Sequence, residues 1–529
     1  MAHKLNIFFC IFFFFFLHQE NISTSHFLHW FSSHRPHFTH KELTTEDVMF
    51  SLQWDRPMVS HWNSVQDSSS AKQSTVSLDR PQSRYCVGEN LDVRVEMRDH
   101  KGQVKRHGGD FILGRIYSPK LQASASGLVT DHYNGSYRVR FTLFWPGDVQ
   151  ISVLLMHSSE AVQTLWRSRQ LNYKKIKHTG TFVSRNKVET SECGFQLNTN
   201  QSLCEYKDER DGEYYACYKP ASLPCDSIDT MSSANTPGSA LTNDEKLLLT
   251  CDNFFKKFIA VPLPLSLSLS LSLSVVTPYK GLQKCIPGMK SPIPSGYFFG
   301  SRWFSSSCKT VNFFDAESIN SCLKGKRIYF NGDSTMRQWI QYLNHFQKDF
   351  KSLDGTGFSS MIIANHHSNF TIQWKNHGHP WITVRPIKIA ESRYISRDLD
   401  SIKVEGKEEQ VVVVISVGQH FRAFPLELFV RRLLSLRRAI QRLQTRILGT
   451  QVFIKLENTR EFSSEQERFS DWHGHLQNLA QKKVFGDLNV GFIDAWDMTV
   501  AANTFRVHPS EAIVANEMAV FLSYLCHAP

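Results

Sequence analysis

The sequence of 529 residues predicts two consecutive domains, an antiparallel β-sandwich of immunoglobulin-like type and then an α/β domain with a parallel sheet. Short segments that alternate apolar and polar residues, separated by turn residues, predict the sandwich. From about residue 290, apolar strand-like runs alternate with helical patterns, which is typical of a parallel sheet covered by helices. A chain of this length also exceeds what one ordinary hydrophobic core holds.

The first 20 residues, MAHKLNIFFCIFFFFFLHQE, have the pattern of a secretory signal peptide. Lys4 provides the positive charge, and residues 5–17 form an almost wholly apolar run. An ordinary membrane-spanning helix needs roughly 20 apolar residues, so this run is too short, and no later stretch is long and apolar enough. Because no A-x-A cleavage pattern follows, a short uncleaved anchor is the alternative. Residues 21–84, rich in His, Ser and Gln, are predicted to form a flexible leader.

Residues 85–230 are predicted to form the sandwich and a cysteine-rich tail. The segments LDVRVEMRD, FILGRIYS, GSYRVRFTLFW and DVQISVLLMH alternate apolar and polar residues, as half-buried strands do. DHKG, HYNG and WPGD separate them, and the Asn-Gly pair at 134–135 is a strong signal for a tight turn. Four cysteines between 193 and 225 indicate a disulfide-stabilised segment after the sandwich.

The cysteine count supports an oxidising compartment. Removing Cys10 with the signal peptide leaves ten of the eleven cysteines, an even number that favours disulfides. No C-x-x-C pair is present, so a zinc site has no support. Glycosylation sequons occur at Asn134, Asn200 and Asn369. The formal charge of +11 suits acidic partners, but in the secretory pathway nucleic acid is not expected among them.

Residues 231–285 are predicted to be a linker. They contain PLPLSLSLSLSLSVV at 262–276, a Leu/Ser repeat with no evident partner strand, which we expect to be poorly ordered. The second domain then covers 286–529. RIYF, QVVVVISVG, TQVFIKLEN and NVGFIDAWD are its expected strands, and the second is apolar enough to be buried on both faces. PLELFVRRLLSLRRAIQRLQ and SEAIVANEMAVFLSYLC are its expected amphipathic and closing helices.

Polar residues at three predicted strand ends are the candidates for chemistry, because functional groups gather beyond the carboxyl ends of parallel strands. The first strand turns into a helix at Ser334, which is typical of a nucleophile elbow; a capping serine is the alternative. His508 precedes the last helix and is suited to remove the Ser334 proton. An acidic side chain from the third strand end would orient the imidazole, and the candidates are Asp494 and Asp497.

The remaining candidates would bind the oxyanion or the substrate. They flank Ser334 or follow the second strand, and comprise Gly332, Asp333, Gly418, Gln419 and His420. Arg337, in the first turn of the helix, opposes the helix dipole, so we expect it to bind a substrate carboxylate or a nearby acid. The histidines of NHHSNFTIQWKNHGHP (366, 367, 377 and 379) lack an acidic companion, so an exposed loop is predicted there and no metal site.

The motifs GDST, GQHFR and IDAWD…VHP resemble the PC-esterase domain of the neurexophilin and PC-esterase (NXPE) family, within the SGNH/GDSL-type hydrolases. GGDF, SGLVTDHYNGSYRVRFTLFWPG and LLMHSSEAV resemble the neurexophilin-like domain. The resemblance implies Ser334 as the nucleophile and His508 as the base. Many SGNH enzymes keep an Asp three residues before the His, where this chain has Phe505, so Asp494, Asp497 or a simple Ser–His dyad are open. His420 stands where the group often has an oxyanion Asn.

Two functions follow from the resemblance. The first is acyl-ester chemistry on glycans in the secretory pathway, as an O-acetyltransferase or O-acetylesterase that acts on sugars such as sialic acid. No bound cofactor is expected, and acetyl-CoA is a possible donor for a transferase, although no nucleotide-cradling motif is present. The second is a non-catalytic secreted glycoprotein that binds the ectodomain of a cell-surface receptor, as neurexophilins do. Binding of anionic glycans through the basic surface is a third, less specific function.

Overall fold

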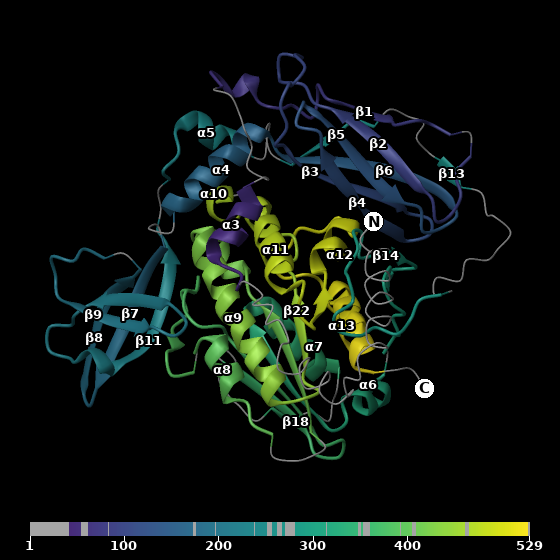
Figure 1. Ribbon diagram of the computed structural model, residues 1–529. Helices are drawn as coiled ribbons and strands as arrows, with labels where there is room; N and C mark the ends of the chain where they lie inside the picture. Colours follow the sequence, from purple (N-terminus) through teal and green to yellow (C-terminus); the bar gives the residue numbers. More distant parts are fainter. Residues whose placement is uncertain are drawn as a thin grey trace, which may run out of the picture. The chain divides into compact units, whose positions relative to one another are not determined.

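The computed structural model describes residues 42–53, 62–82, 84–172, 176–195, 197–236, 239–250, 256–261, 267–269, 281–313, 315–346, 351–352, 360–391, 393–404, 409–460 and 465–526. Thr45–Pro529 form one compact unit, and the following account concerns its described residues. The predicted signal peptide lies outside them. Three β-sheets, two of them antiparallel, organise this unit (Figure 1).

The first sheet has ten strands, of which seven lie in the order β1-β2-β5-β4-β3-β6-β12. β13 also pairs with β6, and the β14–β15 hairpin joins β4. Every pairing in this sheet is antiparallel, as the alternating pattern predicts. The strands are β1 (Thr75–Leu78), β2 (Asn90–Glu96), β3 (Phe111–Ser118), β4 (Ala123–Asp131), β5 (Ser136–Thr142), β6 (Gly147–His157), β12 (Lys257–Ile259), β13 (Leu267–Leu269), β14 (Gly296–Phe299) and β15 (Arg302–Ser305).

β4 belongs to both halves of this sheet. Its first residues pair with β3 and its last residues pair with β5, so one continuous sheet replaces the two separate sheets expected of an immunoglobulin-like sandwich. Apolar side chains of both halves still meet in a single core. Gly114 and Gly127, paired across β3 and β4, make room for it, because a Cβ on Gly114 would lie 2.4 Å from Cγ1 of Val139.

Several elements do not follow the predicted division of the chain into leader, linker and domains. β1 lies within the predicted leader, and α3 (Thr45–Gln53) of the same segment packs against helices of the second domain. β12 and the Leu/Ser residues Leu267–Leu269 pair with β6, although the segment was predicted to be a linker. The hairpin β14–β15, expected in the second domain, extends the first sheet. Pairing with an open sheet edge explains these differences, since backbone groups there accept any extended segment.

The second sheet contains six antiparallel strands in the order β20-β11-β7-β8-β10-β9. Two disulfides, Cys193–Cys217 and Cys204–Cys225, stabilise it, in agreement with the predicted cysteine-rich segment. Its strands are β7 (Ile176–Ser184), β8 (Lys187–Gly194), β9 (Leu203–Asp208), β10 (Glu213–Tyr218), β11 (Ile228–Asn235) and β20 (Ile387–Lys388). Close to these two antiparallel sheets lie η1 (Val65–Asp67), α4 (Ser159–Asn172), η3 (Cys225–Ser227) and α5 (Asn243–Leu248).

The third sheet has seven strands in the order β17-β18-β19-β16-β21-β22-β23, and it is parallel from β19 to β23. This confirms the predicted mostly parallel sheet, with an antiparallel edge at β17 and β18. The strands are β16 (Lys326–Gly332), β17 (Lys351–Ser352), β18 (Ser360–Asn365), β19 (Phe370–Lys375), β21 (Gln410–Ser416), β22 (Gln451–Lys455) and β23 (Gly491–Ile493).

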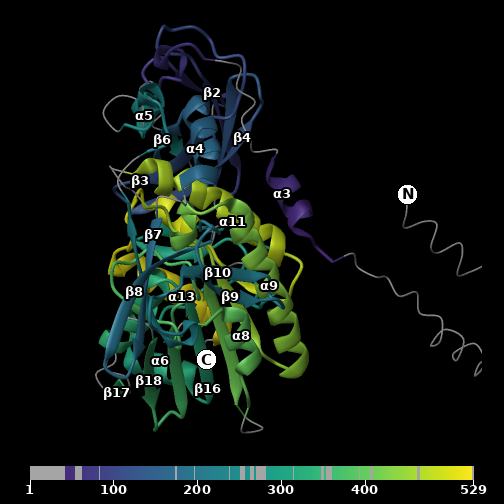
Figure 2. The same ribbon diagram turned by 90° about the vertical axis from the view of Figure 1, so that its left-hand side faces the viewer.

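Helices cover both faces of the third sheet (Figures 1 and 2). α8 and α11 pack against α9, and α13 packs against α6 and α7. Six consecutive residues of β21 are buried, as expected for a strand covered on both sides. The helices are α6 (Ala316–Leu323), α7 (Ser334–Phe346), α8 (Ile395–Ser401), η4 (Gln419–Ala423), α9 (Leu426–Arg446), α10 (Gln466–Phe469), α11 (Asp471–Phe485), α12 (Ala495–Ala501) and α13 (Glu511–Leu525).

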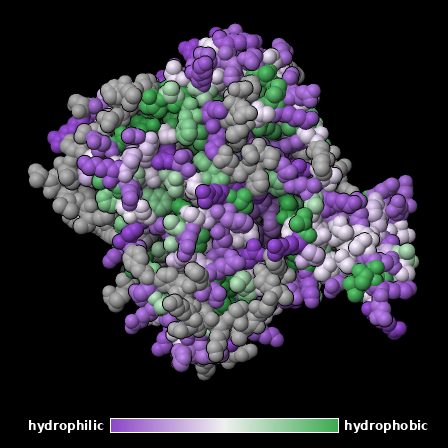
Figure 3. Space-filling view, turned by 180° about the vertical axis from the view of Figure 1, so that it is seen from behind, coloured by the Kyte–Doolittle hydropathy of each residue, from purple (hydrophilic) through white to green (hydrophobic). Residues whose placement is uncertain are grey.

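Two further disulfides, Cys285–Cys308 and Cys322–Cys526, stabilise the second domain. Cys86 has no disulfide partner among the described residues, and Cys251 lies outside them. The sequon residues Asn134, Asn200 and Asn369 are exposed. Hydrophilic side chains are spread over much of the surface in Figure 3. Within the part of the chain that the structure describes, no helix combines the length and the apolar character needed to span a bilayer.

Candidate active site

Ser334 lies at a sharp turn between β16 and α7, as the sequence predicts. Gly332 ends the strand with φ 155°, and a Cβ there would lie 2.0 Å from the carbonyl oxygen of Ser416 on β21. Only glycine allows this close approach of two backbones. The turn leaves Ser334 partly exposed at the first position of α7, where helix amides have no partner inside the helix.

The structure brings Ser334 and His508 together. Nε2 of His508 lies 2.8 Å from Oγ of Ser334, although the two residues are 174 positions apart in the sequence. This distance suits transfer of the hydroxyl proton to the ring. Desolvation lowers the pKa of His508 below its usual value, and the charges of Arg337 and Arg460 lower it further, while Asp333 acts in the opposite direction. The ring is therefore neutral near pH 7 and able to accept the serine proton.

Three side chains hold the loop that carries His508. Nδ2 of Asn458 donates to the carbonyl oxygens of Arg506, at 2.9 Å, and of Val507, at 3.3 Å. The Thr459 hydroxyl donates to the carbonyl oxygen of Thr504, and Gln338 of α7 donates to that of Pro509. Asn458 and Thr459 follow β22, so the carboxyl end of this strand fixes the base opposite the serine.

Asp333 was predicted to bind the oxyanion or the substrate, but its carboxylate supports the turn. It is 1% exposed, and its carboxylate accepts hydrogen bonds from the Thr335 amide, the Thr335 hydroxyl and the Gln419 amide. The pKa of the Asp333 carboxyl is lowered overall, so the group is ionised. Burial alone would raise this pKa, but the neighbouring His420 and the hydrogen bonds have the larger, opposite effect. Asp333 thus ties the end of β16 to the loop after β21.

Gln419 is likewise occupied by the protein. Nε2 of its side chain donates to the backbone carbonyl oxygen of Asn458, and Oε1 of its side chain accepts from Arg460. The predicted role of this side chain in binding an oxyanion does not fit these contacts. Among the described residues, none accepts a hydrogen bond from the Ser334 or Gly418 amides, so these two amides are able to donate to a ligand.

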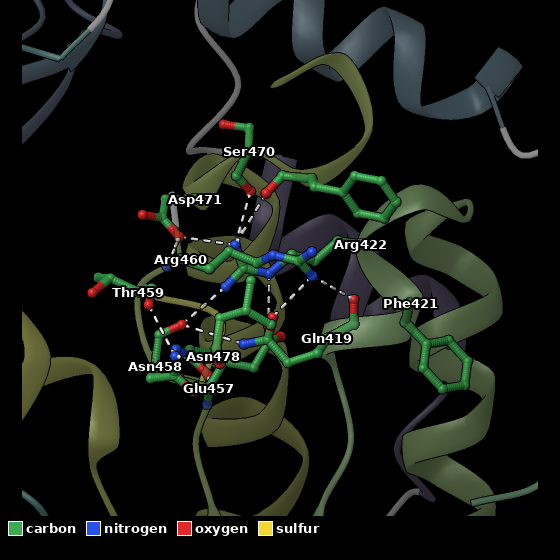
Figure 4. A network of polar contacts seen from close by, with 12 residues as sticks. Gln419, Phe421, Arg422, Glu457, Asn458, Thr459, Arg460, Ser470, Asp471 and Asn478 are labelled. Carbon is green, nitrogen blue, oxygen red and sulfur yellow. Dashed lines mark hydrogen bonds and ion pairs between the residues drawn. The ribbon is translucent and has the colours of Figure 1, made fainter. Parts of the chain in front are cut away.

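The close packing at Gly418 reflects a buried charge network beneath the site, which the sequence analysis missed (Figure 4). A Cβ on Gly418 would lie 2.1 Å from Oε1 of Glu457. Arg422, with 0% of its surface exposed, donates to Glu457 and Asp471, each at 2.8 Å. Burial raises the pKa of Glu457 to about 7 despite this ion pair. The signal for this network was the polar run Glu457–Arg460 directly after a buried strand.

The structure does not bring Asp494 or Asp497 to His508. Asp494 caps α12 and accepts from Lys482 at 2.8 Å. Asp497 accepts from the Ser126 hydroxyl at 2.9 Å and the Ser295 amide at 2.6 Å. Among the described residues, Ser334 is the one hydrogen-bond partner of the His508 ring. Asp497 therefore connects the second domain to the first sheet, Asp494 pairs with Lys482 within the second domain, and the site contains a Ser–His pair.

Arg337 lies beside the pair. Its guanidinium is 5.7 Å from the centre of the Trp374 ring, and burial lowers its pKa. Its charge lowers the pKa values of both His508 and His420, which places it within electrostatic reach of the site. Together with Arg460, it makes the surroundings of the serine cationic.

The histidine-rich stretch divides into two parts. His366 and His367 are exposed, as predicted, but His377 and His379 are buried and the prediction of an exposed loop is wrong there. His377 binds His420 through a hydrogen bond of 2.9 Å. Among the described residues, no group of three or more His, Cys, Asp and Glu side chains is placed to hold a metal ion.

The fold and the site define a two-domain protein with a Ser–His pair on the carboxyl edge of a parallel sheet. Residues 48–236 match the family description "Neurexophilin", and residues 303–526 match "NXPE family member 4-like, C-terminal domain". The chain belongs to the NXPE family.

Two solved structures show weak likeness. An active-site mutant of a family two carbohydrate esterase from Clostridium thermocellum is 8% identical, with 86% of this chain and 96% of that chain covered and a TM-score of 0.22. Invasin, a bacterial integrin-binding protein, is also 8% identical, with 59% and 61% covered and a TM-score of 0.14. At such TM-scores neither likeness supports a conclusion about fold or activity.

Proposed function

We propose that this NXPE protein carries out acyl-ester chemistry on glycans in the secretory pathway, as an O-acetyltransferase or O-acetylesterase. The observation that carries the proposal is the 2.8 Å hydrogen bond between Ser334 and His508 at a strand-to-helix turn. This combination of a partly exposed hydroxyl, a neutral imidazole and the unbonded amides of Ser334 and Gly418 is the arrangement of a serine nucleophile.

In the proposed reaction the Ser334 hydroxyl attacks the acetyl carbonyl while His508 accepts its proton. The Ser334 and Gly418 amides donate to the oxyanion, and His508 protonates the leaving oxygen or sulfur as the acyl-serine forms. A sugar hydroxyl or water then attacks the acyl-serine, with His508 again as the base. The negative charge of Asp333 favours the protonated ring between these steps, since it raises the pKa of His508.

The surroundings favour an anionic substrate. Arg337 and Arg460 are close enough for their charges to lower the pKa of His508, and such groups attract carboxylate-bearing sugars, for example sialic acids. Acetyl-CoA is the donor we propose for a transferase. The four disulfides and the exposed sequons fit residence in the secretory pathway.

A fluorophosphonate probe tests the nucleophile directly. We expect the purified protein to be labelled at Ser334, and Ser334→Ala to abolish labelling. His508→Ala should slow labelling by about two to four orders of magnitude, because the general base is lost. Ser523→Ala is a matched control on the same domain. Labelling that persists in Ser334→Ala, or no labelling of the folded protein, would contradict the proposal. Release of acetate from O-acetylated sialoglycans then separates esterase from transferase activity.

A secreted binding glycoprotein is the second candidate. The observation that favours it is the absence, among the described residues, of any carboxylate bonded to His508. The neurexophilin region at 48–236 would then bind a receptor ectodomain. A folded protein that the probe does not label, and that binds a cell-surface ectodomain equally well with Ser334→Ala, would support this second function.

A further inference from the structure

Two histidines joined by a hydrogen bond lie near the candidate nucleophile. His377 follows β19 and is 0% exposed, whereas His420 lies in η4 after β21 and is partly exposed. Nδ1 of His377 lies 2.8 Å from the carbonyl oxygen of Gly378, and its Nε2 lies 2.9 Å from Nδ1 of His420. In each contact, the chemistry of the partner atom decides whether the ring nitrogen carries a proton.

The Gly378 carbonyl can only accept, so Nδ1 of His377 carries a proton. Burial lowers the pKa of His377 to about 3, and the neutral ring then has a lone pair on Nε2. Nδ1 of His420 must therefore be the donor to His377. Burial also lowers the pKa of His420 to about 4, although the charge of Asp333 opposes it. A neutral His420 with its proton on Nδ1 has an unprotonated Nε2.

His420 lies at the same sheet edge as Ser334. The strands that precede the two residues are neighbours, with Gly332 paired to Ser416, and the amide of Gln419, directly before His420, donates to Asp333, directly before Ser334. No described residue donates a hydrogen bond to Nε2 of His420. A lone pair there would repel an oxyanion, so the oxyanion role predicted for His420 is wrong for the neutral ring.

We propose that Nε2 of His420 accepts a hydrogen bond from a second substrate hydroxyl, next to the one that gains or loses the acyl group. The proton of the reacting hydroxyl goes to His508, so the hydroxyl bound by His420 must be a different one. His420 is then a substrate-positioning residue that selects polyhydroxy acceptors over simple alcohols. The inference rests on the proposed function. It identifies the substrate class as compounds that have two neighbouring hydroxyl groups.

The test compares two acceptors that differ in one hydrogen-bond donor. Acetyl-Ser334 is formed from p-nitrophenyl acetate, and its partition to ethylene glycol or 2-methoxyethanol is measured from the ester products. Ethylene glycol has two equivalent hydroxyls, so the preference is counted per reacting hydroxyl. We expect the protein to favour ethylene glycol by about two- to tenfold on this basis, the range of one hydrogen bond. His420→Asn keeps a donor toward His377 but has no acceptor at the Nε2 position, and should lose the preference. His420→Gln places an amide oxygen near that position and should retain part of it.

The outcomes separate the two proposals. If acetyl-Ser334 never forms, both the proposed function and this inference are overturned. If it forms and the wild-type protein shows no preference between the two alcohols, only the inference fails, and this measurement requires no variant. A preference that survives in a folded His420→Asn protein with unchanged formation of acetyl-Ser334 also overturns it.

Discussion

At the scale of the residue, the charges around His508 set the pH dependence of the proposed reaction. Desolvation and the charges of Arg337 and Arg460 lower the pKa of His508 below 6.5. The acid limb of kcat/KM should therefore lie below pH 6.5, because the base loses activity only when it is protonated. Arg337→Gln should move the limb to higher pH, whereas Arg337→Lys, which keeps the charge, should move it less. A pH–rate profile checks this, and a wild-type limb above pH 6.5 would be inconsistent with it.

The serine and the histidine of the pair could be predicted from the sequence, whereas their hydrogen-bond partners could not. Ser334 and His508 each follow a strong local signal, an abrupt turn after an apolar strand and a histidine before a helix. Asp494 and Asp497 had the same kind of signal, yet Lys482 and Ser126 bind them. Local sequence shows which side chains lie at a sheet edge, but not which partner each side chain contacts there.

At the scale of the element, strands and helices with a clear apolar period were predicted closely. FILGRIYS is β3 residue for residue, and the predicted long helix is α9 within a few residues. α11 was missed because its buried face contains His473, Gln477 and Gln481, which hide the helical period. The strands of the second sheet were missed for a similar reason, since β8 is mostly polar and half of the residues in β9 are charged.

Gly332→Ala tests the strand-to-helix turn. The new Cβ would lie 2.0 Å from the Ser416 carbonyl oxygen, at a φ that L-residues rarely adopt. We expect loss of Ser334 labelling and destabilisation well above about 1 kcal/mol, since two strands must separate. Gly325→Ala is the matched control at the other end of β16, because it also has positive φ but meets no atom within 4 Å. It should cost about 1 kcal/mol. Chemical denaturation of both variants measures this, and equal losses would refute the steric account.

At the scale of the whole molecule, buried and half-buried histidines make stability depend on pH. Burial lowers the pKa of a set of them to between about 3 and about 4, namely His157, His178, His377, His420 and His475. As the pH falls from the unfolded pKa of about 6.5 towards these folded values, the unfolded chain binds protons that the folded chain does not, so the free energy of unfolding decreases over this window. The raised pKa values of Asp110, Asp497 and Glu457 act in the opposite direction, but these groups are fewer.

The midpoint of urea unfolding should therefore be lower at pH 5 than at pH 7. His475→Phe provides the matched comparison, because Phe111, Trp472 and Trp496 surround this ring and would accept another aromatic one. The variant should show a pH dependence weaker by about one proton. An equal or higher midpoint at pH 5 in the wild-type protein would show that the buried carboxyl groups dominate.

The hydrogen bonds of Asp497 have a consequence for how such proteins can be recombined. This buried carboxylate on α12 joins Ser126 of the first sheet to the element that leads into the His508 loop. Excising residues 48–236, or exchanging them for a foreign module, would remove Ser126, a hydrogen-bond partner of the buried Asp497 carboxylate on the helix before the His508 loop. The two regions are therefore expected to be inherited together. A chimaera with a crossover between them needs a side-chain hydroxyl in the first sheet that can donate to Asp497, as Ser126 does.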